Sequence, residues 1–176
     1  RMQRDLRERI DRKLRQRPPQ DEVIYFLLPD RFANGDPSND HGGYAPEKLV
    51  SGFDPADPEF YHGGDLAGLT QRLDYIQGLG ATAVWLAPIF KNKPVQTHGN
   101  YTGAAHHGYW ITDFTAVDPH FGDEAAMRAF VDAAHARGIA AVIAADLAHI
   151  ILGFPERRDS TVFTDIAFTG IITGQC

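Results

Sequence analysis

The sequence predicts an α/β protein with a parallel sheet, because apolar segments of strand length alternate with helical segments and long polar loops. Three apolar segments, 23–28, 83–87 and 139–145, have the length and composition of strands. Each of the first two is followed by a long loop and then by a helix, which is the repeating unit of proteins with right-handed crossovers. Because the run 23–28 is uninterrupted, we expect strands that are covered on both faces.

Two helices are indicated between these strands by apolar residues at helical spacing and by the glycines that follow them. The first is expected to begin at Leu66 and to be ended by Gly78 and Gly80, and the second is expected over 123–137. The apolar face of the first helix consists of Leu66, Leu69, Leu73 and Ile76.

The two ends of the chain follow this pattern less well. Residues 1–21 are expected to form a helical or disordered lead-in, because Pro18 and Pro19 stop the charged segment before them. Residues 150–176 are apolar and rich in Thr and Ile without a helical period, which indicates a divergent or truncated tail. The ordered domain is therefore expected over 22–149.

Composition and charge narrow the class of protein. The 176 residues are 43% hydrophobic, which suits one globular core. A formal net charge of −6 provides no basic field for a polyanion, so nucleic acid is not expected as a partner. No apolar run approaches the ~20 residues that span a bilayer, and the start of the chain lacks a signal peptide, so no membrane partner is expected. The single cysteine, Cys176, excludes an internal disulfide and indicates nothing about compartment or oligomeric state.

Residues 29–65 and 88–122 are the two long loops, and both follow the C-terminal ends of predicted strands. Barrels and open α/β sheets place their sites at this edge. Loops of this length inside compact domains are usually functional. The candidate site residues are therefore sought here.

Side chains with oxygen atoms cluster in the first loop around a turn made by Gly35 and Pro37. Hard cations such as calcium take six to eight oxygen ligands, which this cluster could provide in part. A turn without a ligand is the alternative, because Asn, Asp and Gly are ordinary turn residues, and Asp65 could simply cap the first helix. The oxygen donors of the loop are Asn34, Asp36, Asn39 and Asp40.

Flat aromatic residues stand beside polar ones in the second loop. Sugar sites need aromatic faces for stacking and His, Asp or Asn for hydrogen bonds to hydroxyls. His107, Tyr109 and Trp110 fit that requirement, although the aromatic rings could also belong to the core. The pair His106-His107 suggests zinc as an alternative, but adjacent side chains point apart and no third ligand follows at metal spacing.

Taken together, these segments resemble the opening of the α-amylase family, glycoside hydrolase family 13, from about residue 22 to residue 149. The resemblance implies that the chain forms a partial (β/α)8 TIM barrel covering about its first three β/α units, since a complete barrel needs roughly 250 residues. The motifs that carry it are Val-Ile-Tyr at 23–25, Asp-Arg-Phe at 30–32, Asn-Gly-Asp at 34–36, Gly-Gly-Asp at 63–65, Thr-Ala-Val-Trp-Leu at 82–86 and His-Gly-Tyr-Trp at 107–110.

The resemblance also implies roles for individual residues. Tyr109 would stack on the sugar at the cleavage subsite, with His107 beside it and Trp110 and Asp113 in support, and His149 would hydrogen-bond the same sugar. The first loop resembles the calcium site of the family's cyclodextrin glycosyltransferases, so Ca²⁺ is the implied cofactor. Its ligands would be the side chains of Asn34, Asp36, Asn39, Asp40 and Asp65 and the carbonyl of Gly63.

The chain departs from the family pattern at the end of the third strand. Aligned on His149, the family's aspartate and asparagine positions hold Ala144 and Ala148, so a second calcium site of the family loses an oxygen ligand. Asp146 lies on the same strand face as Ala144, and we hypothesise that it partly replaces the lost charge. His106 stands where the family often has a tyrosine.

The carboxyl groups that would cleave a glycosidic bond are not expected within this chain. Retaining cleavage needs a nucleophile and an acid/base roughly 5 Å apart, and in the family both follow later strands. Asp165 lacks an arginine two residues before it, so it is interpreted as a surface acid. No catalytic residue is assigned, and the isolated chain is expected to be inactive.

The function implied by the resemblance is that of a fragment of a retaining glycoside hydrolase, secreted or periplasmic, acting on α-1,4-linked glucans such as starch or maltodextrins. Hydrolases, transglycosylases and isomerases share these motifs, so the reaction and the substrate length stay open. Two other interpretations are a non-catalytic glucan-binding protein and a decayed or frameshifted gene product.

Overall fold

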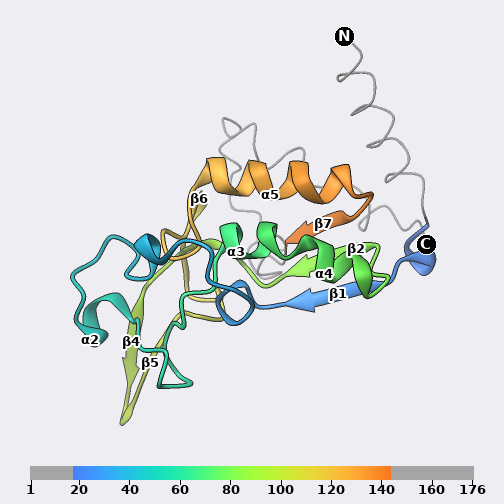
Figure 1. Cartoon of the computed structure of the whole chain (residues 1–176). Helices are drawn as coiled ribbons and strands as arrows, with labels where there is room; N and C mark the ends of the chain where they lie inside the picture. The colour runs from blue at the N-terminus through green and yellow to red at the C-terminus, as the bar shows by residue number, and fades with distance from the viewer. Residues whose placement is uncertain (1–17, 144–176) are drawn as a thin grey trace.

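The computed structural model describes residues 18–143 of the chain. Its centre is a parallel sheet of β1 (Ile24–Leu27), β2 (Ala83–Leu86) and β7 (Ala140–Ile143), in the order β1-β2-β7 (Figure 1). The parallel sheet predicted from the sequence is confirmed. Before β1 lies a single helical turn, η1 (Pro19–Asp21).

One face of the sheet is covered by helices α3 (Leu66–Gln71), α4 (Leu73–Gly78) and α5 (Glu124–Ala136) (Figure 1). Val84 and Leu86 of β2 point to this face and are fully buried. Because side chains alternate along a strand, this face collects every second residue of each strand. The helix residues that complete the core are Leu69, Leu73, Ile76, Met127, Phe130 and Ala134.

The opposite face of the sheet is open, so the expectation of strands covered on both faces is wrong for the described residues. Ile24, Phe26 and Trp85 lie on this face and are 53%, 49% and 44% exposed. The rings of Phe26 and Trp85 meet edge to face, with centroids 5.6 Å apart. An apolar run indicates that both faces of a strand can be covered by other elements. It does not show that those elements lie within residues 18–143.

The helix predicted from Leu66 onward is interrupted at Arg72, where φ is −105° and ψ is 11°. The Thr70 hydroxyl donates a 2.7 Å hydrogen bond to the carbonyl of Leu66, and such bonds bend helices. Apolar spacing continues through the break, which is why periodicity alone did not reveal it.

The second predicted helix is confirmed as α5, which lies within the expected span 123–137. The Asp123 carboxylate accepts a 2.8 Å hydrogen bond from the nitrogen of Ala126 and caps the first turn. Gly138 follows the last turn with φ of 73°, a left-handed conformation that favours glycine.

The first long connection contains short helical turns, as a polar, turn-rich segment should. They are η2 (Pro29–Arg31), η3 (Pro37–Asn39) and α2 (Lys48–Ser51). An isolated bridge between Phe53 and Tyr61 joins two parts of this connection. No helix in the described range is both long and apolar enough to cross a bilayer.

The second long connection was expected to be a loop, and the structure corrects this: it contains short antiparallel strands. β3 (Phe90–Asn92) pairs with β6 (Ile111–Val117), and β4 (Val95–His98) pairs with β5 (Tyr101–Ala104). The β4–β5 hairpin projects away from the parallel sheet (Figure 1). These strands escaped prediction because β4 and β5 are short and mostly polar, without the apolar alternation that marks a half-buried strand.

Candidate functional site

The first long connection folds back onto the start of α3, where the Asp65 carboxylate is fully buried. This carboxylate accepts hydrogen bonds from the backbone nitrogens of Gly35, Asp36 and Gly68 at 3.1, 2.8 and 2.6 Å. The side-chain nitrogen of Asn39 donates to it at 3.2 Å. Asp65 therefore caps the helix, the simple alternative considered from sequence, and ties the loop to that cap.

Two glycines allow the loop to approach the helix this closely. A Cβ on Gly35 would lie 2.1 Å from the nitrogen of Gly68, and a Cβ on Gly68 would lie 2.0 Å from the carbonyl oxygen of Ala33. Any larger side chain at either position would push the loop off α3.

The remaining predicted cation ligands meet beside this contact. The Asn34 side-chain nitrogen donates to Asp40 Oδ1 at 2.7 Å. At Gly63, whose φ is 88°, a Cβ would lie 2.5 Å from Asp40 Oδ1 and 2.6 Å from Asn34 Nδ2. Partial burial raises the pKa of Asp40, and the nearby carboxylates of Asp65 and Asp36 raise it further.

The six residues predicted as calcium ligands thus come together from two segments, held by hydrogen bonds within the protein. Within residues 18–143, no three His, Cys, Asp or Glu side chains are grouped closely enough to hold a metal, which also gives no support to a zinc site. A cation here would depend on amide and carbonyl oxygens in addition to carboxylates, a donor set that suits calcium. Asn39 Oδ1 is buried without a hydrogen-bond partner, and Asn39 and Asp36 line a pocket of about 250 Å³. The donor set therefore fits the implied cation.

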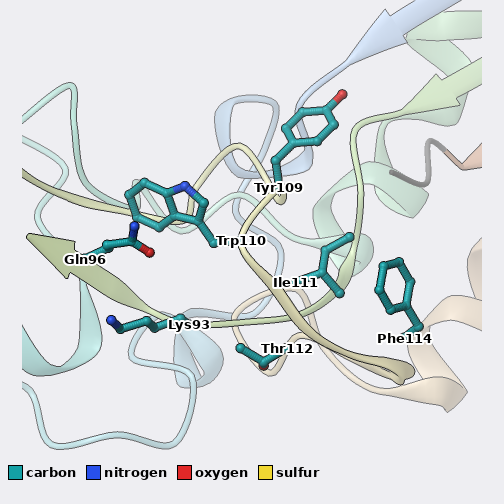
Figure 2. Close-up of a pocket in the computed structure, with 7 residues that line it drawn as sticks. All are labelled: Lys93, Gln96, Tyr109, Trp110, Ile111, Thr112 and Phe114. Atoms are coloured by element: carbon teal, nitrogen blue, oxygen red, sulfur yellow. The ribbon is translucent and has the colours of Figure 1, made fainter. Parts of the chain in front are cut away.

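The predicted sugar-binding residues of the second connection form one aromatic group. His107 stacks on Tyr109 with centroids 5.9 Å apart and meets the ring of Trp110 edge-on at 4.8 Å. Tyr109, shown in Figure 2, is 49% exposed, so it is not a core residue. Gly108 has φ of 84°, and a Cβ there would lie 1.9 Å from the carbonyl oxygen of Pro88, so the aromatic group is held against the end of β2.

The protonation of His107 follows from its contacts. Its Nδ1 accepts a 3.0 Å hydrogen bond from the backbone nitrogen of Tyr109, which places the ring proton on Nε2. Burial lowers the pKa of His107, so the ring is neutral at neutral pH. The Nε2–H group is then the donor that this ring can offer to a ligand.

Next to this group, two buried nitrogens have no hydrogen-bond partner among the described residues: His106 Nδ1 and Arg31 Nη1. Burial, together with the nearby Arg31 guanidinium and His107, lowers the pKa of His106 to about 4. Arg31 is held in place by hydrogen bonds from Nη2 to the carbonyl oxygens of Pro58 and Phe60, at 2.7 and 2.9 Å.

Asp30 has a structural role that the sequence did not reveal. Its buried carboxylate accepts hydrogen bonds from the backbone nitrogens of His62 and Gly63 and lies 3.3 Å from Arg31 Nε. Burial raises the pKa of Asp30 to about 6 in spite of these contacts. The only sequence signal was its position in the Asp-Arg-Phe motif at the end of the first strand.

His120 was also missed, and it joins the two long connections. Its Nδ1 lies 2.8 Å from Asp118 Oδ1 and its Nε2 lies 2.8 Å from the carbonyl oxygen of Ser51. The ring is buried and stacks on Tyr61 with centroids 4.0 Å apart. A histidine two residues after an aspartate was the only local signal of this contact.

Part of the predicted site lies outside the described residues, and the structure places none of it. This concerns His149, the departures Ala144 and Ala148, and the acids Asp146 and Asp165.

Comparison with known proteins assigns the chain to a family. Residues 26–150 match the family described as alpha amylase, catalytic domain. The chain belongs to the α-amylase family, whose catalytic domain is a (β/α)8 barrel.

Individual relatives agree with this assignment. The chain is 58% identical to an α-amylase of Streptomyces lividans over 92 residues, which are 52% of this chain and 10% of the relative. It is 45% identical to the periplasmic α-amylase of Escherichia coli over 121 residues, which are 66% of this chain and 17% of the relative. The crystal structure of a γ-cyclodextrin glucanotransferase from Bacillus clarkii superimposes with a TM-score of 0.63 at 33% identity, covering 72% of this chain and 18% of that chain. The chain therefore spans less than a fifth of each of these three relatives.

Proposed function

We propose that this chain supplies the first three β/α units of the catalytic barrel of a retaining glycoside hydrolase that acts on α-1,4-linked glucans. The observation that supports this most is the group of His107, Tyr109 and Trp110 after β2, with the Tyr109 ring half exposed. We call these three residues the sugar platform. Membership of the α-amylase family and the names of the relatives point to the same class of substrate.

The chemistry of the platform suits a glucose unit. A glucose ring has an apolar face, which can stack on the exposed Tyr109 ring, and a rim of hydroxyls. The Nε2–H group of His107 donates a hydrogen bond to one of these hydroxyls, because its Nδ1 is engaged by the backbone.

The platform binds the sugar but does not cleave it. Retaining cleavage requires two carboxyl groups roughly 5 Å apart. Of the acids in this part of the chain, Glu59 accepts a hydrogen bond from the Tyr101 hydroxyl, and Asp113 accepts hydrogen bonds from the backbone and hydroxyl of Thr115. We therefore assign binding, and no step of bond cleavage, to the described residues, and we expect the isolated chain to be inactive.

The proposed cofactor is Ca²⁺, held by the loop against α3. The proposed ligands are Asn34, Asp36, Asn39, Asp40, Gly63 and Asp65. Two of them, Asn34 and Asn39, direct their amide nitrogens at carboxylates, so each amide would turn over to offer its oxygen. When bound, the cation would hold the loop on the helix by neutralising acids that otherwise repel one another.

The proposed location is outside the cytoplasm, secreted or periplasmic. It rests on the similarity to a periplasmic α-amylase of Escherichia coli. Expression of the complete protein with a tag, followed by fractionation of the culture, tests this location directly.

The binding proposal is tested by titrating the folded 176-residue chain with maltose and longer maltooligosaccharides, using calorimetry. Tyr109→Ala is expected to weaken binding about tenfold, since stacking on the ring is lost. Tyr75→Ala is the matched control, because Tyr75 is 55% exposed on α4, away from the platform. A folded chain that binds no maltooligosaccharide, or a Tyr109→Ala variant that binds as the wild type does, would contradict the proposal.

A further inference from the structure

The turn that brings the first long connection onto α3 contains an asparagine followed by a glycine, Asn34 and Gly35. A backbone nitrogen can attack the side-chain carbonyl of the asparagine before it, and a side chain on the attacking residue hinders this approach. Glycine has no side chain and a mobile backbone, so Asn34 is the asparagine most open to this reaction. The other three asparagines of the chain are followed by larger residues: Asn39 by Asp40, Asn92 by Lys93 and Asn100 by Tyr101.

The folded structure leaves this pair accessible. Asn34 is exposed, so water can reach its side-chain carbonyl carbon. The backbone nitrogen of Gly35 donates to Asp65 Oδ1 at 3.1 Å, whereas the nitrogen of Gly68 donates to the same oxygen at 2.6 Å. Because the bond from Gly35 is the longer of two that share one acceptor, it restrains the attacking nitrogen only weakly.

We propose that Asn34 is a site of spontaneous deamidation, and that the modified residue loosens the loop from α3. The Gly35 nitrogen loses its proton to solvent and bonds to Cγ of Asn34, while the bond from Cγ to Nδ2 breaks and Nδ2 takes up a proton and leaves as ammonia. Water then opens the five-membered imide, at Cγ to give aspartate or at the backbone carbonyl carbon of Asn34 to give isoaspartate. One water is consumed and one ammonia is released, so the reaction needs no oxidant or cofactor.

The aspartate product removes a contact that holds the loop together. In the unmodified chain, Asn34 Nδ2 donates a 2.7 Å hydrogen bond to Asp40 Oδ1. A carboxylate at position 34 has no N–H to donate, so two like charges meet where a donor met an acceptor. The backbone of Gly63 limits their retreat on one side, because a Cβ there would lie 2.5 Å from Asp40 Oδ1 and 2.6 Å from Asn34 Nδ2. The repulsion is therefore relieved by movement of the loop.

The isoaspartate product has a larger effect, because it routes the backbone through the side chain and lengthens it by one carbon. Gly35 lies so close to α3 that a Cβ on it would be 2.1 Å from the nitrogen of Gly68 and 2.5 Å from the carbonyl carbon of Ala67. A longer backbone at this point does not keep that contact. Both products are expected to loosen the loop in the absence of a bound cation, and the inference does not rest on the proposed function.

Peptide mapping of the folded 176-residue chain tests the site. After incubation for weeks at neutral pH with a chelator, the peptide that carries Asn34 is expected to gain about 1 Da. The rate is expected to be at least about tenfold higher than at Asn100, which corresponds to a barrier lower by about 1.4 kcal/mol. Asn100 is the matched control, because it is also exposed but precedes Tyr101.

The tryptic peptide 32–48 also contains Asn39, so fragmentation of this peptide is needed to assign the change. Asn39 then serves as a second control within the same loop. No gain at Asn34, or equal rates at Asn34 and Asn100, would overturn the proposal.

Melting temperatures measured with a chelator test the effect on the loop. Asn34→Asp, which reproduces the aspartate product, is expected to melt about 2–4 °C below the freshly prepared wild type. Incubation is expected to lower the melting temperature of the wild type but not that of Asn34→Gln, which keeps the amide but would have to close a less favourable six-membered ring. Equal melting temperatures of Asn34→Asp and the wild type, or an equal loss in Asn34→Gln on incubation, would show that deamidation does not loosen the loop.

Discussion

The backbone nitrogen of Asp36 donates a 2.8 Å hydrogen bond to the carboxylate of Asp65, 29 positions further along the chain. The same carboxylate accepts from Gly68 in the first turn of α3, so one buried side chain joins a surface turn to a core helix. The position of the loop therefore depends on Asp65 whether or not a cation is bound. This separates the structural role of the residue from its proposed role as a ligand.

Asp65→Ala is expected to lower the free energy of unfolding by about 2–4 kcal/mol, because three backbone N–H groups lose their acceptor. Urea denaturation in the presence of a chelator measures this without any contribution from calcium. Asp21→Ala, which removes an exposed acid far from the loop, is expected to change stability by less than about 0.5 kcal/mol. A loss of under about 1 kcal/mol for Asp65→Ala would show that the loop is held by other contacts.

Calcium is expected to raise the melting temperature, because a cation that binds only the folded chain stabilises it. At a free concentration one hundred times the dissociation constant, the gain is about 2.7 kcal/mol. Calorimetric melting curves with calcium and with a chelator measure it. Asp40→Ala is expected to abolish the difference in melting temperature between calcium and chelator, and Asp21→Ala is expected to preserve it. Equal melting temperatures of the wild type under both conditions would contradict the calcium site.

Asp30→Asn is expected to change how stability depends on pH. Burial raises the pKa of Asp30 from 3.8 to about 6 on folding, so the folded chain takes up this proton first as the pH falls. The contribution of this group to stability is therefore present below pH 3.8 and lost as the pH rises through 6. Urea denaturation at several values between pH 4 and pH 7 is expected to show that the stability of Asp30→Asn no longer declines as the pH rises through this range. An unchanged pH profile in this variant would show that another group causes the decline.

His106→Phe is expected to change the pH profile in the opposite direction. Burial lowers the pKa of His106 from 6.5 to about 4, so the unfolded chain takes up this proton first. Its contribution to stability is present above pH 6.5 and lost as the pH falls toward 4. The same denaturation series is expected to show smaller acid destabilisation in His106→Phe, with His98→Phe at the exposed hairpin tip as the control.

The central elements could be predicted because their signals are local. The apolar composition of β1, β2 and β7 and the stop at Gly138 are properties of a few neighbouring residues. The hairpin of β4 and β5 could not be predicted in this way, because Gln96 and Thr97 form a strand only when they pair with Gly103 and Thr102. The exposed sheet face around Trp85 was missed for a related reason. Whether a strand face is buried depends on which other segments pack against it, and the local sequence does not contain that information.

The candidate site shows the same division. Composition pointed to four oxygen-bearing side chains of the first loop and to the aromatic residues of the sugar platform before any geometry was known, and the family resemblance added Gly63 and Asp65 as ligands. The contacts of Asp30, Arg31 and His120 were not visible, because each joins residues that lie far apart in sequence. The closeness of Lys93 and Trp110 was likewise hidden, since they are brought together only by the pairing of β3 with β6.

By itself, the sequence determined that three parallel strands alternate with helices and that acids, amides and aromatic rings follow the strand ends, because these are matters of composition and short-range spacing. The tertiary structure alone decided that the Asp65 carboxylate accepts several hydrogen bonds, that Tyr109 is half exposed and that, within residues 18–143, one face of the sheet is left uncovered. The physical reason is that burial, hydrogen-bond saturation and exposure are set by which distant segments pack together, and a linear pattern does not contain those distances.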